Sequence, residues 1–274
     1  MAASFVPMRD ERVAETTQDV VLGGRLALRQ PRHGHRVGHD AILLAAATQA
    51  RPGERAVDLF AGVGAAGLAL ALRVPRLDVT FVEIDPALVT LARDNIARND
   101  LSDRARAVVL DVDAPAREFS AAAISAASAD RVLMNPPFND PLRQRVSPQA
   151  GRRLAHAASH GQLSGWTGVA SRLLKPNGVL TLIWRADRLA HALDALAGRF
   201  GAIAVLPVHA RPDAAAIRVL LRAVKSSRAP LRLLPGLVLA DAAGRPTAEA
   251  EAVLRENAEL PLAEGTDWRP RPPD

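Results

Sequence analysis

Short apolar runs alternate with helix-like segments through the middle of the chain. The apolar runs predict buried strands at residues 55–60, 78–83, 105–110, 131–134, 179–184, 203–208 and 217–223. Helices are expected between them at 65–73, 86–99, 162–174 and 189–199, with Lys175-Pro176-Asn177-Gly178 as a turn. Strands and helices that alternate at this spacing indicate an α/β fold with a doubly wound, mainly parallel sheet.

The segment before this core has a different pattern. Residues 19–30 predict two short strands around Gly23-Gly24, because glycine accepts the positive φ of a hairpin turn. Asp40 is expected to cap a buried helix over 41–47. The expected organisation is a flexible N-terminal arm (1–16), a hairpin and helix (17–50), the α/β core (51–225) and a C-terminal extension with a disordered tail (226–274).

Composition excludes several classes of protein. Among the 274 residues, 49% are hydrophobic and 23% are charged, which is the balance of a folded globular protein. The absence of cysteine excludes disulfides, thiolate metal sites and a cysteine nucleophile. The seven histidines show no metal-ligand spacing, so no metal is expected. The start lacks the apolar region of a signal peptide, and the longest uncharged apolar run, 59–72, is short and rich in glycine. A cytoplasmic protein without a membrane partner is therefore expected.

Basic residues are segregated along the chain. No acid occurs in 141–186 or in 214–240, and a further basic cluster lies between residues 25 and 36. Segregated positive charge is typical of proteins that bind polyanions, so RNA is the expected partner. The candidate RNA-binding residues are Arg25, Arg29, Arg32, Arg36, Arg143, Arg145, Arg152 and Arg153.

A glycine-rich segment indicates a nucleotide site. Gly62-Val63-Gly64-Ala65-Ala66-Gly67 follows an expected strand and opens an expected helix, and Glu83 ends the next strand, where it could accept both ribose hydroxyls. The spacing fits a dinucleotide. However, a carboxylate at Asp58 would repel a pyrophosphate and suits the ammonium group of S-adenosylmethionine. By the same logic Asp111 would accept the adenine amino group, with turn or cap chemistry as the alternative for both aspartates.

The fourth core strand ends in Asn135-Pro136-Pro137-Phe138. Two prolines fix φ and remove two N–H donors, so the loop presents carbonyl oxygens rigidly. The Asn135 side chain and the Pro136 carbonyl could accept both N–H bonds of an exocyclic amine, while Phe138 stacks on the base. Ligands of open α/β sheets bind beyond the carboxyl ends of the strands, where this loop would lie. The loop predicts methyl transfer to such an amine, and a Pro-Pro turn with a core phenylalanine is the alternative.

These motifs together resemble those of class I S-adenosylmethionine-dependent methyltransferases that modify amino groups. The segments 37–44, 228–239 and 244–247 are similar to those of the bacterial tRNA1(Val) adenine-37 N6-methyltransferase family. The resemblance spans about Thr17 to Leu254 and implies a seven-stranded sheet, S-adenosylmethionine as cofactor and tRNA as substrate. It implies catalysis at Asn135, Pro136, Pro137 and Phe138, and cofactor contacts at Asp58, Phe60, Gly62, Gly64, Glu83, Ile84, Asp111, Val112 and Asn135, with Asp40 as a further candidate.

One departure leaves alternatives open. The adenine enzymes of this family usually have tyrosine where Phe138 stands, and this chain contains no tyrosine. Phenylalanine there is common among rRNA guanine-N2 methyltransferases. Release-factor glutamine N5-methyltransferases share the Asn-Pro-Pro-aromatic motif, although the basic segments favour RNA over a protein substrate. Adenine N6 in DNA, and a non-enzymatic nucleic-acid-binding module with a degenerate cofactor site, are the remaining alternatives.

Overall fold

The computed structural model describes residues 15–33, 36–137 and 160–262. Its main sheet has nine strands in the order β10-β8-β9-β7-β6-β3-β4-β5, with β11 also paired to β8. All neighbours are parallel except β9, which runs antiparallel to both β7 and β8. The strands are β3 (Arg55–Leu59), β4 (Asp78–Glu83), β5 (Ala105–Val109), β6 (Ala129–Met134), β7 (Leu174–Arg185), β8 (Phe200–His209), β9 (Ala216–Lys225), β10 (Arg232–Leu233) and β11 (Leu237–Val238).

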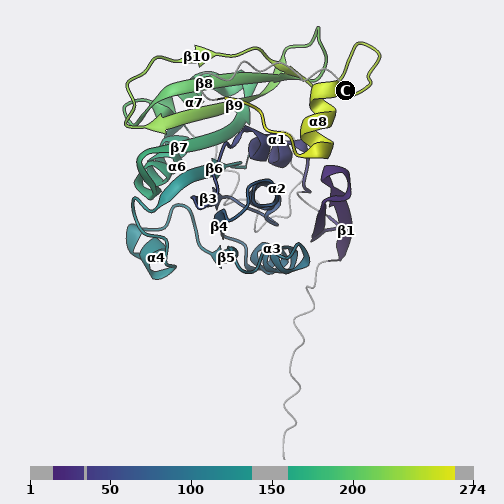
Figure 1. The fold of residues 1–274 in the computed structure, drawn as a ribbon. Helices are drawn as coiled ribbons and strands as arrows, with labels where there is room; N and C mark the ends of the chain where they lie inside the picture. Colours follow the sequence, from purple (N-terminus) through teal and green to yellow (C-terminus); the bar gives the residue numbers. More distant parts are fainter. Residues whose placement is uncertain (1–14, 34–35, 138–159, 263–274) are drawn as a thin grey trace, which may run out of the picture.

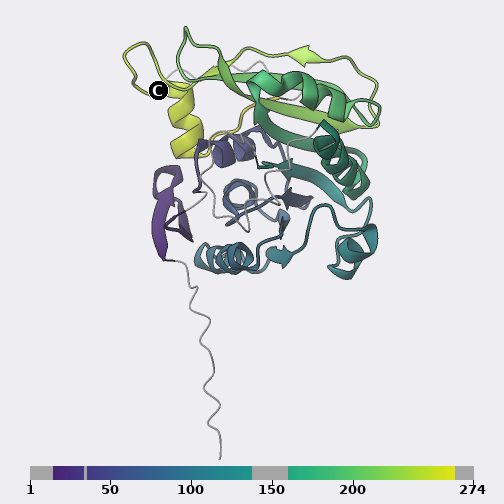
Figure 2. The same cartoon turned by 180° about the vertical axis from the view of Figure 1, so that it is seen from behind.

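Helices cover both faces of this sheet (Figures 1 and 2). Residues of α1 (His39–Ala47), α2 (Ala65–Arg73), α3 (Pro86–Arg98) and α8 (Ala248–Glu256) share one apolar core. Residues of α4 (Ala116–Ala121), α6 (His160–Leu173) and α7 (Leu189–Leu196) share the other. The predicted doubly wound fold and its seven core strands are confirmed, and β10 and β11 are short additions at one edge.

The predicted N-terminal hairpin is also present. β1 (Thr16–Val21) pairs antiparallel with β2 (Leu26–Pro31) through the short 3-10 turn η1 (Leu22–Gly24), where Gly23 and Gly24 have φ of 61° and 99°. A Cβ on Gly23 would lie 2.8 Å from the carbonyl oxygen of Arg255 in α8. Glycine at this position therefore provides both the left-handed backbone and the close packing of the hairpin turn against α8.

The prediction that Asp40 caps α1 is wrong. The helix begins at His39, its N-cap is Gly38, and no side chain caps it. Asp40 lies in the first turn and accepts a hydrogen bond of 2.9 Å from Nε of Arg218 in β9. Because the helix begins one residue before Asp40, this carboxylate lies past the cap position and accepts a charge-assisted bond from the guanidinium instead.

The expected turn at 175–178 is a bulge inside β7. Leu174 pairs with Ala129 and Val179 pairs with Arg131, so these four residues stand opposite Asp130 alone. Pro176 cannot donate to the ladder, and Asn177 has φ of 60°. The segment thus interrupts the regular strand backbone, as its sequence predicts. It does not reverse the chain, because Leu174 still pairs with β6 and the strand continues across the bulge.

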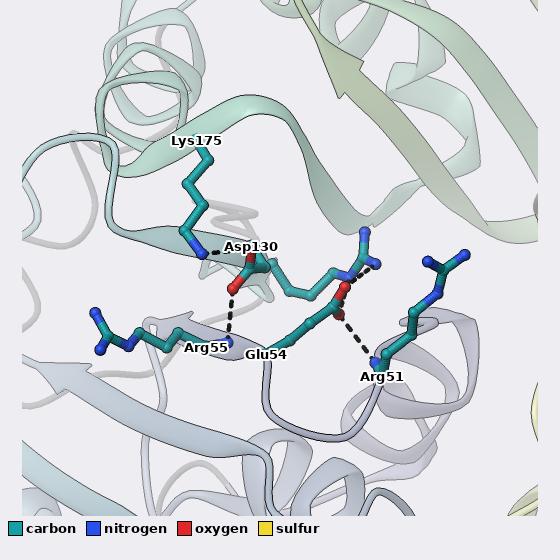
Figure 3. A network of polar contacts seen from close by, with 6 residues as sticks. Arg51, Glu54, Arg55, Asp130 and Lys175 are labelled. Atoms are coloured by element: carbon teal, nitrogen blue, oxygen red, sulfur yellow. Dashed lines mark hydrogen bonds and ion pairs between the residues drawn. The ribbon is translucent and has the colours of Figure 1, made fainter.

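Charged residues join the strands at the amino-terminal edge of the sheet (Figure 3). Arg131 donates two bonds of 2.8 Å to the Glu54 carboxylate, and Lys175 Nζ lies 2.7 Å from Asp130 Oδ1. Burial alone would raise the pKa of Asp130, but bonds donated by Lys175 and by the Arg55 N–H outweigh it and hold this pKa below its usual range. The network stabilises the edge opposite the carboxyl ends of the strands.

Some expectations concern residues outside the described ranges. Most of the expected N-terminal arm, residues 1–14, lies outside them, as does the tail from residue 263.

Among the helices that the structure describes, none has the length and apolarity needed to cross a membrane.

Candidate cofactor and methyl-transfer site

The carboxyl ends of four adjacent parallel strands bring most of the candidate residues to one edge. In the order β6-β3-β4-β5 these strands end next to Asn135, the glycine-rich segment, Glu83 and Asp111. The register pairs Leu59 with Met134, so the chain leaves β3 and β6 side by side. Asp40, in the first turn of α1, bonds Arg218 of β9, and β7 separates β9 from the strand that precedes Asn135.

The glycine-rich segment forms a tight loop between β3 and α2. Its Gly62 N–H donates to Glu83 Oε2 at 2.9 Å, and its Gly64 N–H donates to the Ala61 carbonyl at 2.8 Å. Gly62 and Gly64 have φ of 56° and 90°. A Cβ on Gly62 would meet nothing within 4 Å. The backbone at Gly62 is therefore open to a ligand, which is what the chemistry of a nucleotide site requires.

Asp58 is the buried acid of this site. Only 1% of its surface is exposed, and its Oδ2 accepts a bond of 2.9 Å from the Gly67 N–H in α2. Burial raises the pKa of Asp58 to about 7, the Gly67 N–H acts against this rise, and the nearby Glu83 carboxylate adds to it. At neutral pH this carboxyl is poised between its two protonation states, and a cationic ligand group would favour the ionised one.

Glu83, Ile84 and Asp111 lie at the ends of β4 and β5. The Glu83 carboxylate is held by two backbone N–H groups, those of Gly62 and of Asp85 at 3.0 Å. Beside it the Ile84 side chain is 55% exposed, an apolar surface next to a carboxylate. Asp111 Oδ1 accepts from the Asp113 N–H at 2.9 Å in a local turn, and Val112, between them in the chain, is buried. Carboxylates flanking an exposed apolar side chain fit a ribose and an adenine ring.

The loop after β6 is described only as far as Pro137. Asn135 is half-buried, Pro136 is buried, and no cis peptide bond occurs among the described residues. Phe138, the expected stacking residue, lies outside those residues. The Asn135 side chain and the Pro136 carbonyl are adjacent acceptors at the end of the strand next to the glycine-rich loop.

Sequence reasoning missed an aromatic contact between Phe60, just before the glycine-rich loop, and Trp166 in α6. The backbone φ of Phe60 is 62°, which is unusual for a residue other than glycine. Its ring contacts the Trp166 ring edge-on, with 4.7 Å between the ring centroids. Trp166 is 2% exposed, and its Nε1 is buried without a hydrogen-bond partner among the described residues. The position of Trp166 on the apolar face of a predicted helix gave no sign that it packs against the site.

The four arginines of the N-terminal cluster are engaged within the fold. Arg29, Arg32 and Arg36 form ion pairs of 3.3, 3.0 and 2.9 Å with Asp94, Glu15 and Asp19. Arg25 donates to the Glu256 carbonyl at 2.7 Å. Surface ion pairs of this kind stabilise a protein by only about 0–1 kcal/mol, so phosphates could replace these partners. The other candidates, Arg143, Arg145, Arg152 and Arg153, lie outside the described residues, and RNA binding by either group stays a prediction.

Comparison with known proteins identifies the family. A model of the family described as "Methyltransferase small domain" matches residues 35–211. The chain belongs to this methyltransferase family. Membership confirms the class I methyltransferase fold predicted from the sequence, and S-adenosylmethionine as the cofactor. Within the described residues, no group of three or more His, Asp or Glu could hold a metal ion.

Several relatives carry names that specify a reaction. The chain is 30% identical over 155 residues to a tRNA1(Val) (adenine(37)-N6)-methyltransferase of Tolumonas auensis, an alignment that covers 56% of this chain and 61% of the relative. The chain is also 30% identical to the protein of that name from Phocaeicola vulgatus, over 68% of this chain and 75% of the relative. The alignment with the first of these relatives thus spans less than two thirds of its length.

A solved structure has the same fold over most of the chain. A protein of Agrobacterium tumefaciens described as a predicted O-methyltransferase superposes with a TM-score of 0.68 and 28% identity, covering 81% of this chain and 98% of its own.

Proposed function

We propose that the chain transfers a methyl group from S-adenosylmethionine to N6 of an adenine in tRNA. The observation that carries this proposal is the position of Asn135 and Pro136, whose acceptors follow the strand next to the glycine-rich loop. The names of the relatives from Tolumonas auensis and Phocaeicola vulgatus support adenine N6 in tRNA as the target.

The cofactor would be held across the ends of β3, β4 and β5. Glu83 would accept from the ribose hydroxyls, the Ile84 side chain would pack on the adenine, and Asp111 would accept from its amino group. The open backbone at Gly62 would lie against the amino-acid part, with the Asp58 carboxylate facing its ammonium group. When bound, S-adenosylmethionine supplies an electrophilic methyl group on a positively charged sulfur.

Asn135 and Pro136 would prepare the acceptor nitrogen. An exocyclic amine conjugated to a base is poorly nucleophilic because its lone pair is delocalised into the ring. Two acceptors that take both N–H bonds, Asn135 Oδ1 and the Pro136 carbonyl, favour a pyramidal nitrogen with its lone pair turned toward the methyl group. These residues act by orientation, which can contribute several kcal/mol to lowering a barrier. The target adenine must leave its stack to reach them.

The state of Asp58 predicts a pH dependence of cofactor binding. A ligand with an ammonium group favours ionised Asp58, so below pH 7 binding must release the proton that the raised pKa retains. We expect the affinity for S-adenosylhomocysteine, measured by calorimetry, to rise between pH 5.5 and about 7 by up to tenfold per pH unit and then level off. In Asp58→Asn this slope should disappear.

The free protein should show the matching effect in its stability. The unfolded chain ionises Asp58 near pH 3.8, whereas the folded chain keeps the proton until about pH 7. This group therefore lowers the free energy of unfolding progressively between these values, and the loss persists above them.

5′-Methylthioadenosine, which lacks the ammonium group, is the control ligand for the pH dependence of binding. The same pH slope for this ligand would contradict a role of Asp58 toward the ammonium.

Methyl transfer to separate substrates tests the proposed function. Labelled S-adenosylmethionine would be offered with unmodified tRNA, unmodified rRNA or release factor, and modified nucleosides would be identified by mass. N6-methyladenosine in tRNA would support the proposal. N2-methylguanosine in rRNA would make guanine N2 the target in place of adenine N6, as the phenylalanine at position 138 would suggest. Label in release factor alone would refute the RNA substrate.

A further inference from the structure

Asn95 in α3 and Asn99, the C-cap residue of α3, hold the N-terminal hairpin to the core. On the edge of β2 that does not pair with β1, the N–H and C=O groups of Ala27 and of Arg29 each bond to one side-chain amide. Asn99 accepts from the Ala27 N–H at 3.0 Å and donates to the Ala27 carbonyl at 2.8 Å. Asn95 accepts from the Arg29 N–H at 2.6 Å and donates to the Arg29 carbonyl at 3.0 Å. Spaced one helical turn apart, the two amides take the place of a neighbouring strand.

Asn95 makes one contact that Asn99 lacks. Its second amide hydrogen is donated to the carbonyl of Val63 at 3.0 Å, in the middle of the glycine-rich loop. Asn95 is fully buried and Val63 is 6% exposed, so water cannot substitute for this bond. One side chain therefore binds both the hairpin and the loop that precedes α2.

Three hydrogen bonds hold the backbone of the glycine-rich loop. Glu83 holds the Gly62 N–H, Ala61 holds the Gly64 N–H, and Asn95 holds the carbonyl of the residue between them. Loss of the third bond would leave a buried carbonyl unsatisfied and free the peptide between the two glycines to rotate. A loop that rotates must be ordered again before it can bind a ligand, which weakens binding.

We propose that Asn95 is a positioning residue that couples the N-terminal hairpin to the cofactor-binding loop. Docking of the hairpin strengthens cofactor binding through the Val63 carbonyl, and by reciprocity the bound cofactor strengthens docking of the hairpin. This inference rests on the placement of the cofactor at the glycine-rich loop in the proposed function.

The test compares Asn95→Ala with Asn99→Ala, since each variant removes one amide from β2 and only the first releases Val63. Binding of S-adenosylhomocysteine is measured by calorimetry below the melting temperature of both variants. The fitted stoichiometry then reports the folded fraction, while Kd reports the loop. We expect Kd to rise roughly tenfold in Asn95→Ala, the factor that one lost buried hydrogen bond produces, and to stay within about twofold in Asn99→Ala.

Hydrogen exchange gives a second readout, which can first be measured in the wild-type chain alone. Saturating S-adenosylhomocysteine should slow exchange in residues 15–33, and this protection should vanish in Asn95→Ala. Equal Kd values for the two variants, or no protection of the hairpin in the wild type, would overturn the inference. Absence of any binding by the wild type would instead refute the proposed function, so the two failures are distinguishable.

Discussion

Asn135→Ala is expected to lower the rate constant of methyl transfer by about 10²- to 10³-fold, the usual cost of removing one polar group that acts on the reacting atoms. The alanine leaves the Pro136 carbonyl as a single acceptor, so the lone pair of the target amine is no longer aimed at the methyl group. Single-turnover assays with saturating tRNA and cofactor measure this step directly. The effect should fall on kcat rather than on KM for tRNA.

Two further variants separate hydrogen bonding from shape. Asn135→Asp keeps acceptor oxygens in the same place and should retain more activity than the alanine variant. Asn177, exposed in the β7 bulge with φ of 60°, offers the control Asn177→Gly at the opposite edge of the sheet, and this variant should react at the wild-type rate. An alanine variant at position 135 with wild-type single-turnover kinetics would remove Asn135 from the mechanism.

Gly67→Ala is expected to lower the free energy of unfolding by about 1–3 kcal/mol, the usual cost of overpacking a core. Alanine is normally the better helix former by about 1 kcal/mol, so an open position would give the opposite sign. Here a Cβ would lie 2.4 Å from the Phe81 ring in β4 and 3.0 Å from Asp58 Oδ2, and both neighbours are buried. The close approach of α2 to the sheet therefore outweighs the gain in helix propensity.

Gly165→Ala is the matched control for this prediction. Gly165 lies in α6, and a Cβ there would meet nothing within 4 Å, so this variant should be as stable as the wild type or slightly more stable. Urea unfolding of both variants gives the comparison. If Gly67→Ala were as stable as Gly165→Ala, α2 would have room to shift away from β4.

The core of the fold could be predicted because its signals are local. Apolar runs marked the seven strands, and glycines marked the hairpin turn and the loop before α2. The insertion of β9 between β7 and β8 has no such signal, since both β8 and β9 are apolar and their order depends on pairing across the whole sheet. α4 has only six residues, too few for a periodic pattern.

In the candidate site, too, the residues marked by local signals could be predicted from the sequence. Asp58, Glu83 and Asn135 could be located because each lies at or beside the carboxyl end of a strand, within a recognisable motif. The role of Asn95 could not, because it depends on which carbonyl lies opposite an amide after α3 and β2 have packed. Asn95 inside α3 was the available signal, since asparagine is unfavourable in a helix interior without a partner.

The position of β8 in the sheet affects folding during synthesis and the behaviour of truncated fragments. Among the strands that the structure describes, residues 200–209 pair with β9, β10 and β11 alone, and all three follow residue 211, the last residue of the family match. During synthesis β8 emerges with both edges unpaired, and it can join the sheet only after β9 has been made. A fragment that stops at residue 211 would carry an unpaired apolar strand, so its solubility would not measure the stability of the domain.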